Sequence, residues 1–309
     1  GCMVIKLGMI GLSEGNGHPF SFSSIINGYS DSGLADSGWP GIYDYVRRRD
    51  LSEFGFDGVQ VTHAWTQDQD VTRKLCASSR IQYTVDLAED MIGNVDGVII
   101  ARDDYENHLS MAIPFLKAGL PVFVDKPLSL DVGELRAFRP YLESGKLMSC
   151  SGMRYAKELD EPRASLGAYG EIRLIRGAIL NSWEKYGIHL LDAILNIVRC
   201  KPVSVVAIDA PHVSVAVQMD DGMVLQLDAL GELCRCFRID ILGTKQITSH
   251  EIVDNFSMFR RLLWHFVQSV KTGVPAIEPD HTLTVMRLLI AGRLACNERR
   301  KVSLHEIRI

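Results

Sequence analysis

Short apolar runs that alternate with helical segments constrain the fold of the first part of the chain more than any other feature. Residues 4–10, 95–101 and 122–124 are rich in Val, Ile and other apolar residues, and helical patterns lie at 70–79 and 108–120. Such runs predict buried strands, because strands covered on both faces are apolar along their whole length. The alternation of strand and helix predicts an α/β domain with a parallel, Rossmann-type sheet.

The pattern changes after Gly145 to a series of short runs that are β-branched or alternate between apolar and polar residues. These runs lie at 171–179, 202–210, 212–219, 223–229 and 236–242. Helices are expected at 188–199 and 257–272, and Asp220-Asp221-Gly222 predicts a hairpin turn between two strands. The second part is therefore predicted to be an α+β domain with an open, mostly antiparallel sheet and helices on one face.

A length of 309 residues fits two domains, which we expect at 1–128 and 129–309. The uncovered face of the second sheet is expected to be apolar, which predicts a homodimer or homotetramer. About 40 residues separate the first glycine-rich turn from the next predicted strand, more than one crossover helix needs. The surplus, 31–53, includes a predicted helix at 42–49, and we interpret it as an insertion that forms a lid or a subunit contact.

Charge and composition exclude several classes of partner. A net charge of −5 with interspersed acidic and basic residues predicts no nucleic-acid partner. The apolar runs are shorter than the ~18 residues of a membrane helix, so we expect no membrane partner and a cytoplasmic location. An odd, scattered set of cysteines predicts buried free thiols; they are Cys2, Cys76, Cys150, Cys200, Cys234, Cys236 and Cys296. Cys234 and Cys236 have no companions at ligand spacing, so no metal site is predicted.

A glycine-rich turn at 11–17 follows the first predicted strand. A dinucleotide-binding turn needs small residues, so that backbone N–H groups and the next helix can approach the pyrophosphate. Gly11 and Gly15 meet that need, whereas Ser13 and Asn16 replace the second and third glycines of the fingerprint Gly-x-Gly-x-x-Gly. Taken alone, the turn fits a cofactor loop and an ordinary glycine-rich turn equally well.

The segment Asp125-Lys126-Pro127 follows the apolar run at 122–124. The carboxyl end of a buried strand would place Lys126 at the edge where open α/β sheets bind ligands. A lysine that is partly buried beside other charges is suited to proton transfer. A surface Lys-Pro turn is the alternative reading of these three residues alone.

Asp125-Lys126-Pro127 resembles the Glu-Lys-Pro motif of the glucose-fructose oxidoreductase, inositol dehydrogenase and MocA (Gfo/Idh/MocA) family of nicotinamide-dependent dehydrogenases, with Asp in place of Glu. Residues 187–192 are similar to the family's Gly-x-His-x-x-Asp helix, and residues 266–304 resemble its C-terminal segment. The chain is therefore identified as a divergent member, with an ambiguous region between about Ser21 and Phe56. The resemblance implies an enzyme that uses NAD or NADP.

The resemblance also implies cofactor contacts beyond the glycine turn, at Asp125 and Lys126 of the motif. Arg102 and His108 stand in the loop that lies under the nicotinamide in the family; His108 matches the family pattern and Arg102 departs from it. The strand predicted at 57–63 should end in an acid that holds the adenosine ribose of NAD. No acid stands there, and His63 could contact a ribose or a 2′-phosphate instead, so NAD and NADP both stay open.

Catalytic roles follow from the same resemblance. His189 corresponds to the proton-transferring histidine, and Lys126 to the lysine that stabilises a developing alkoxide. The family has an Asp four residues before this His, where the present chain has Lys185, which cannot act as a carboxylate. Glu184 is adjacent and could substitute for it. A histidine that merely packs in a helix is the alternative for His189.

The implied reaction is hydride transfer between nicotinamide and a secondary alcohol or ketone of a carbohydrate or cyclitol-like substrate. Arg154 and Tyr155 follow a strand-like run at 147–152, and with Glu184 they are expected to bind this substrate. Two alternatives stay open: a catalytically degenerate nucleotide- or sugar-binding protein on the same scaffold, which Lys185 favours, and an NAD-using glycosidase or lyase. The substrate, the direction of reaction and the oligomeric state are not fixed by the sequence.

Overall fold

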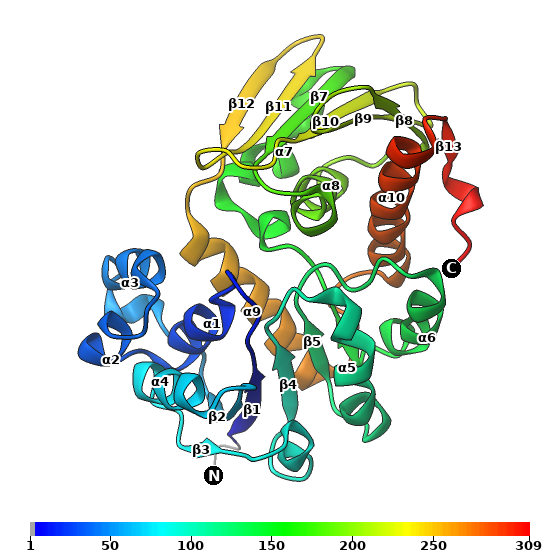
Figure 1. Cartoon of the computed structure of the whole chain (residues 1–309). Helices are drawn as coiled ribbons and strands as arrows, with labels where there is room; N and C mark the ends of the chain where they lie inside the picture. The colour runs from blue at the N-terminus through cyan, green and yellow to red at the C-terminus, as the bar shows by residue number, and fades with distance from the viewer. Residues whose placement is uncertain (1–3) are drawn as a thin grey trace. The chain divides into compact units, whose positions relative to one another are not determined.

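The computed structural model describes residues 4–309 and shows two compact units (Figure 1). The first unit contains the chain up to Leu128, together with Phe138–Ser149 and Phe259–Ile277. The second unit contains Ser129–Ala137, Cys150–Met258 and Glu278–Ile309. The chain therefore passes from one unit to the other several times.

A parallel sheet of six strands forms the centre of the first unit, in the order β3-β2-β1-β4-β5-β6. The strands are β1 (Ile5–Ile10), β2 (Val59–Trp65), β3 (Tyr83–Thr84), β4 (Gly97–Ile100), β5 (Val122–Val124) and β6 (Leu147–Met148). All residues of β4 and β5 are buried, as expected for central parallel strands. The predicted Rossmann-type sheet is confirmed. The strand order reverses between β1 and β4, which is where such sheets bind dinucleotides.

Helices connect these strands. They are α1 (His18–Asn27), α2 (Asp31–Ala35), α3 (Pro40–Arg47), α4 (Gln69–Ser79) and α5 (His108–Lys117). The predicted helices at 70–79 and 108–120 are α4 and α5. Helix α5 ends before Leu120 because Gly119 adopts a left-handed φ of +80°, and the N–H of Leu120 then donates back to the carbonyl oxygen of Phe115 at 3.0 Å.

The segment predicted to be an insertion is a packed helical layer of the first unit. It holds α2, α3 and the 3₁₀ turn η1 (Leu51–Glu53). Gly33 of α2 approaches α4 so closely that an added Cβ would lie 2.6 Å from the carbonyl oxygen of Ala77. Before α1, a Cβ on Gly17 would lie 2.5 Å from Ile42 and 2.7 Å from Trp39. Helix α2 therefore packs on α4, and the start of α3 packs on the start of α1.

The second unit is built on a mixed sheet of seven strands, in the order β12-β11-β7-β10-β9-β8-β13. The strands are β7 (Ile172–Ile179), β8 (Pro202–Ile208), β9 (Val213–Met219), β10 (Val224–Ala229), β11 (Phe237–Gly243), β12 (Ile247–Glu251) and β13 (Val302–Ser303). Only β7 and β10 pair in parallel among the described strands of this sheet. The predicted open, mostly antiparallel sheet is confirmed, and β12 and β13 are additions to the prediction.

Helices α8 (Ile188–Leu195) and α10 (Pro279–Glu298) cover one face of this sheet (Figure 1). A Cβ added to Gly177 of β7 would lie 3.0 Å from Leu190 of α8. The remaining helices are α6 (Val132–Glu143), α7 (Asp160–Ala164) and α9 (Asn255–Thr272), which corresponds to the helix predicted at 257–272. Helix α8 ends before the predicted residue 199, and the side-chain amide of Asn196, which follows its last residue, is hydrogen-bonded to Arg154.

The opposite face of the sheet is mixed, so the prediction of an apolar face is wrong. Arg176 and Arg238 point to that face and are exposed. Val206 (40% exposed), Ile208 (56%) and Ile247 (67%) share it. A sheet face without covering helices keeps charged side chains in contact with water.

The six described cysteines are free, and Cys2 lies outside the described residues. Cys150 is buried, whereas Cys234 is exposed and the other four are partly exposed. The prediction of buried thiols therefore holds for Cys150 and is wrong for the rest, because they lie on surface helices, loops and strand ends. In the described part of the chain, no helix is long and apolar enough to cross a membrane.

Candidate active site

The glycine-rich turn follows β1 at the point where the strand order reverses. Gly11 has no room for a side chain, because an added Cβ would lie 2.6 Å from Cγ of Pro19 in α1. Gly15 has the opposite surroundings, since no atom lies within 4 Å of such a Cβ, but its φ of +73° requires glycine. Gly11 therefore lets helix α1 approach the strand, and Gly15 leaves open space above the turn.

The two residues that replace fingerprint glycines tie the turn to neighbouring loops. The Ser13 hydroxyl donates to Oδ1 of Asp103 at 2.8 Å and accepts the N–H of Asp103 at 3.0 Å. The Asn16 amide donates to Oδ2 of Asp125 at 3.0 Å. Just before Ser13, the N–H of Leu12 donates to Oε1 of Gln67 at 2.8 Å. The turn is thus braced by the loops after β2, β4 and β5.

Asp125 is the centre of a buried polar cluster at the end of β5. Its side chain is 3% exposed, and its Oδ2 lies 2.6 Å from Nδ1 of His18. Burial alone would raise the pKa of Asp125, but the charges of His18 and Lys126 and the hydrogen bond from Asn16 hold it well below its usual range. His18 was not predicted as a site residue; its position directly after the glycine turn is the signal that could have found it.

Lys126 follows in the same loop and is 3% exposed. Its N–H donates to Oδ1 of Asp125 at 3.0 Å, so both carboxylate oxygens of Asp125 hold the backbone and side chains around it. Lysine is almost never this deeply buried without a partner. The sequence motif therefore coincides with an enclosed lysine at the carboxyl edge of the sheet.

Arg102 and His108 organise the loop after β4. Arg102 donates two hydrogen bonds to Asp104, at 2.9 and 2.7 Å, and approaches the carbonyl oxygen of Gly11 at 3.5 Å. His108 is fully buried, and its ring nitrogens lie 3.0 Å from the carbonyl oxygen of Leu128 and 2.6 Å from that of Arg102. Both nitrogens of His108 are thus occupied by the main chain, and the side chain links two loops of the site.

The end of β2 presents no carboxylate to a ribose. Asp68 caps α4 by accepting the N–H groups of Asp70 and Val71. His63 lies earlier in the strand, where its ring stacks on Tyr83 at 4.9 Å. Burial, together with the charge of Lys6, lowers the pKa of His63. His63 therefore lies apart from the turn, Asp125 and Lys126.

These residues fit a dinucleotide. The open space above Gly15 leaves room for a pyrophosphate beside the turn, and the close contact at Gly11 allows α1 to begin there. The predicted residues Gly11, Ser13, Gly15, Asn16, Arg102, Asp125 and Lys126 all lie at the carboxyl ends of β1, β4 and β5.

A second cluster lies within the second unit, around Asp192 of α8. Asp192 is 2% exposed; its Oδ1 accepts from Arg154 and lies 2.8 Å from Nε2 of His281, and its Oδ2 accepts the N–H of Ser151 at 2.8 Å. Burial would raise the pKa of Asp192, but Arg154, His281 and the Ser151 N–H together lower it. Asp192 therefore remains a carboxylate inside the unit.

His189 stands next to this cluster and is 8% exposed. Its Nδ1 lies 2.5 Å from the hydroxyl oxygen of Ser151, which also accepts the N–H of Met153 at 3.0 Å. The rings of Tyr186 and Phe237 meet the imidazole at 4.9 and 6.0 Å between centroids. Ser151 was not predicted as a site residue.

The predicted substrate residues Arg154 and Tyr155 are interior residues of the second unit. Arg154 binds Asp192 and donates to Oδ1 of Asn196 at 3.1 Å, and its guanidinium lies 5.2 Å from the centre of the Tyr155 ring. Tyr155 is 9% exposed, and burial raises its pKa. Both side chains therefore contribute to the packing around Asp192.

Lys185 and Glu184 lie in a π-helical turn, Trp183–Gly187, that precedes α8. Hydrogen bonds in such a turn run from i to i+5, and Lys185 still precedes His189 by about one turn of the segment. After burial, the charge of Glu184 is the second cause that raises the pKa of the Cys296 thiol in α10. The Glu184 carboxylate therefore lies on the side of α10.

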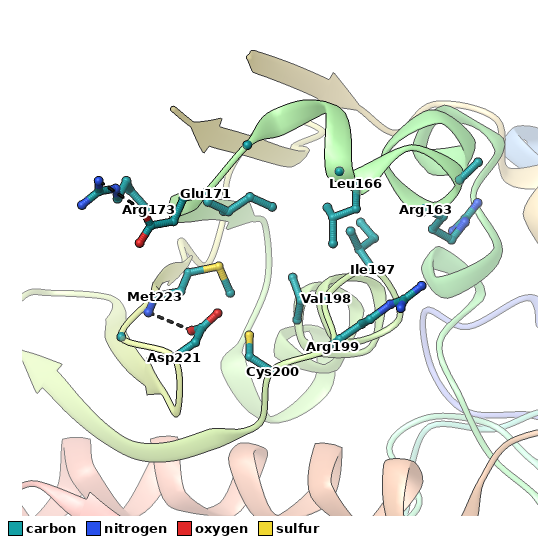
Figure 2. A pocket seen from close by; sticks show the side chains of 15 residues that line it. Arg163, Leu166, Glu171, Arg173, Ile197, Val198, Arg199, Cys200, Asp221 and Met223 are labelled. Carbon is teal, nitrogen blue, oxygen red and sulfur yellow. Dashed lines mark hydrogen bonds and ion pairs between the residues drawn. The ribbon is translucent and has the colours of Figure 1, made fainter. Parts of the chain in front are cut away.

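A groove of about 830 Å³ lies in the second unit. Figure 2 shows the residues that line it, among them Leu166, Ile197 and Val198 and charged residues such as Arg199. No predicted site residue lines it. At its edge, Cys200, Asp220 and Asp221 bring three ligand atoms within 4.8 Å of one another. Burial and the charge of Asp221 raise the pKa of the Cys200 thiol to about 11, so the free sulfur is protonated at neutral pH.

Comparisons with known proteins agree with this fold. A probable dehydrogenase from Thermotoga maritima superposes with a TM-score of 0.77 at 15% identity, over 98% of this chain and 100% of that chain. The myo-inositol 2-dehydrogenase from Lactobacillus plantarum gives 0.77 at 18% identity, over 97% and 99%. The scyllo-inositol dehydrogenase from Lactobacillus casei, solved with NAD(H) and scyllo-inositol, gives 0.75 at 16% identity, over 98% and 99%. At these identities the likeness shows a shared fold.

No curated protein sequence matches the chain significantly. Residues 44–149 match the model of the Gfo/Idh/MocA family, described as an oxidoreductase family with an NAD-binding Rossmann fold. This range contains β2, β4, β5 and the Asp125-Lys126-Pro127 motif. The predicted resemblance is therefore confirmed, and residues 44–149 carry the NAD-binding Rossmann fold of the Gfo/Idh/MocA oxidoreductases.

Proposed function

We propose that the chain is an NAD(P)-dependent oxidoreductase that transfers a hydride between nicotinamide and a secondary alcohol or ketone of a carbohydrate or cyclitol-like substrate. The observation that carries the proposal is the arrangement at the reversal of strand order: a braced glycine turn beside a buried Lys126. Two of the similar solved structures are inositol dehydrogenases, which supports a cyclitol-like substrate.

In this proposal, the turn around Gly15 holds the cofactor pyrophosphate. When bound, the nicotinamide supplies a carbon that accepts or donates hydride. Lys126 stabilises the substrate oxygen as its negative charge develops, and His189 takes the hydroxyl proton in oxidation or returns it in reduction. Asp125 keeps the Lys126 loop in place through its contacts with His18 and Asn16.

The choice between NAD and NADP depends on the end of β2. Asp68, the first carboxylate there, is occupied as the cap of α4, so the acid that repels a 2′-phosphate in NAD enzymes is missing. Titration of the purified protein with NADH and with NADPH, followed by nicotinamide fluorescence, tests the proposal. We expect saturable binding of at least one. Failure of both to bind would contradict the oxidoreductase function.

A catalytically degenerate binding protein is the second candidate, because Lys185 stands where the family has a carboxylate. A cyclitol panel with the cofactor that binds distinguishes the two. Reduction of the cofactor by any member supports the dehydrogenase; cofactor binding without turnover across cyclitols and sugars supports the degenerate protein.

A further inference from the structure

The imidazole of His189 has a partner in the structure that is not the family's carboxylate. We propose, on the basis of the proposed function, that Ser151 is the positioning residue of His189, and that Asp192 in turn holds Ser151. A neutral hydroxyl would then support the proton-transferring histidine at Nδ1. All three residues lie within the second unit.

Ser151 is fixed from two sides, which makes it a rigid support. Its main-chain N–H donates to Oδ2 of Asp192 at 2.8 Å, and its hydroxyl oxygen accepts the N–H of Met153 at 3.0 Å. The side chain is fully buried, so no water competes for the hydroxyl. The same hydroxyl oxygen lies 2.5 Å from Nδ1 of His189, within hydrogen-bond distance. A support with this burial and these bonds holds the ring in one orientation.

A hydroxyl can form a hydrogen bond with Nδ1 in both protonation states of His189 that the reaction needs. With a proton on Nδ1, His189 donates to Ser151, and Nε2 accepts the proton of the substrate hydroxyl as its O–H bond breaks. The carbinol carbon gives its hydride to the nicotinamide, and the carbonyl forms. In the reverse direction, the imidazolium gives its Nε2 proton to the substrate oxygen as the hydride returns to carbon, and the neutral ring keeps its Nδ1–H donated to Ser151. A carboxylate could only accept, and its charge would favour the imidazolium.

Charged groups around the pair come from several elements. Asp192 of α8, Arg154 of the turn after β6 and His281 of α10 form one network behind Ser151. Arg235 lies over the ring of Phe237, 4.7 Å from its centre, on the side of β11. Asp192 balances Arg154, and the Ser151 hydroxyl contacts the imidazole at Nδ1.

The test is the titration of His189 in Ser151→Asp, observed by NMR of the ring and assigned by loss of the signal in His189→Ala. Aspartate also suits the position as a cap for the N–H of Met153. We expect the pH midpoint of His189 to rise by about one unit or more, because a carboxylate then stabilises the imidazolium. An unchanged midpoint overturns the proposal.

Ser151→Ala keeps the proposal testable should the aspartate variant not fold. The ¹⁵N resonance of Nδ1 should move in Ser151→Ala and return toward the parent position in Ser151→Thr. Ser149→Ala is the matched control, because it also removes a buried hydroxyl, one without a hydrogen-bond partner. Equal resonances in the parent and in Ser151→Ala contradict the contact.

Kinetics separate this proposal from the proposed function. In an active enzyme, Ser151→Ala should lower kcat by about 10-fold or more while KM for the cofactor is unchanged, and Ser151→Thr should restore part of it. The NMR titration requires no substrate, so it decides the role of Ser151 even where no turnover is found. Loss of turnover with an intact His189–Ser151 contact would count against the function alone.

Discussion

Among single residues, Gly15 provides the most direct test of the proposed cofactor site. A valine there must adopt a φ of +73°, and its side chain would fill the open space above the turn, so Gly15→Val should abolish nicotinamide binding without unfolding the first unit. Gly93→Val is the control, since Gly93 has a φ of +90° and equally open surroundings at the other end of the sheet. Fluorescence titration of both variants checks this. Unchanged affinity in Gly15→Val would refute the assignment.

In the proposed function, Lys126 and His189 act on the substrate oxygen. Lys126→Ala and His189→Ala should each lower turnover by roughly 10² or more while nicotinamide binding survives, because each removes a group that acts on the substrate oxygen. Lys117→Ala, a change of an exposed lysine in α5, should leave turnover as it is. Parent-like rates in both variants would show that the site lies elsewhere.

A third variant, Lys185→Asp, tests the same proposed site. It restores the residue type of the family at the position four before His189. Higher turnover would identify the native protein as a weakened catalyst, whereas loss of turnover would give Lys185 a role of its own toward the substrate. Steady-state rates with the cofactor that binds decide between these outcomes.

The ionisation of Asp192 should make the free energy of unfolding depend on pH. Its pKa is lowered in the folded protein, so its contribution is present above its unfolded pKa, about 4, and is lost as pH falls through the folded value. Asp192→Asn should cost roughly 3–5 kcal/mol at pH 7, because Arg154 is left buried without its carboxylate, and the difference from the parent should shrink below about pH 4. Urea unfolding at both pH values measures this. Asp280→Asn, at an exposed position of α10, should change little at either.

Helix α2 supplies a test at the scale of elements. Gly33→Val would drive a side chain into the main chain of α4 at Ala77, so we expect a loss of roughly 1–3 kcal/mol and looser packing of the inserted layer. Gly41→Val lies in α3 of the same layer with no atom within 4 Å of its Cβ and should be tolerated. Hydrogen exchange of α2 and α4 reports which helix loosens. Equal protection in both variants would show that α2 does not depend on this contact.

The elements of the first unit were predictable because each is encoded locally. Apolar runs marked β1, β4 and β5, and helical periodicity marked α4 and α5. The short β12 and β13 were missed because two to five residues without strong periodicity carry little local signal. The π-helical turn at Trp183–Gly187 was missed for another reason: its sequence fits an ordinary helix, and only tertiary packing of Trp183 against α10 selects the wider turn.

The candidate site was predictable where a motif carries it. Lys126 and the glycine turn follow from residues that adjoin each other in the sequence. Ser151 could not be found this way, because its contact with His189 joins positions 38 apart. Serine is common in turns, and its role follows only from the burial and hydrogen bonds that the fold creates.

At the scale of the whole molecule, we propose that the uncovered sheet face joins copies of the chain as a homodimer or homotetramer. Val206, Ile208 and Ile247 are exposed there among charged residues, a mixture typical of interfaces. Ile208→Glu should shift the protein toward monomer in light scattering after size exclusion. Leu51→Glu changes an equally apolar residue in the first unit, 81% exposed, and should not. A monomeric parent protein would refute the interface.

The bracing of the glycine turn also has a consequence for how fast the cofactor is captured. Leu12, Ser13 and Asn16 are each hydrogen-bonded to a different loop, so the turn loses its conformational freedom when the chain folds and not when a ligand arrives. Association then requires no slow rearrangement of this turn, and its rate is governed by diffusion and orientation.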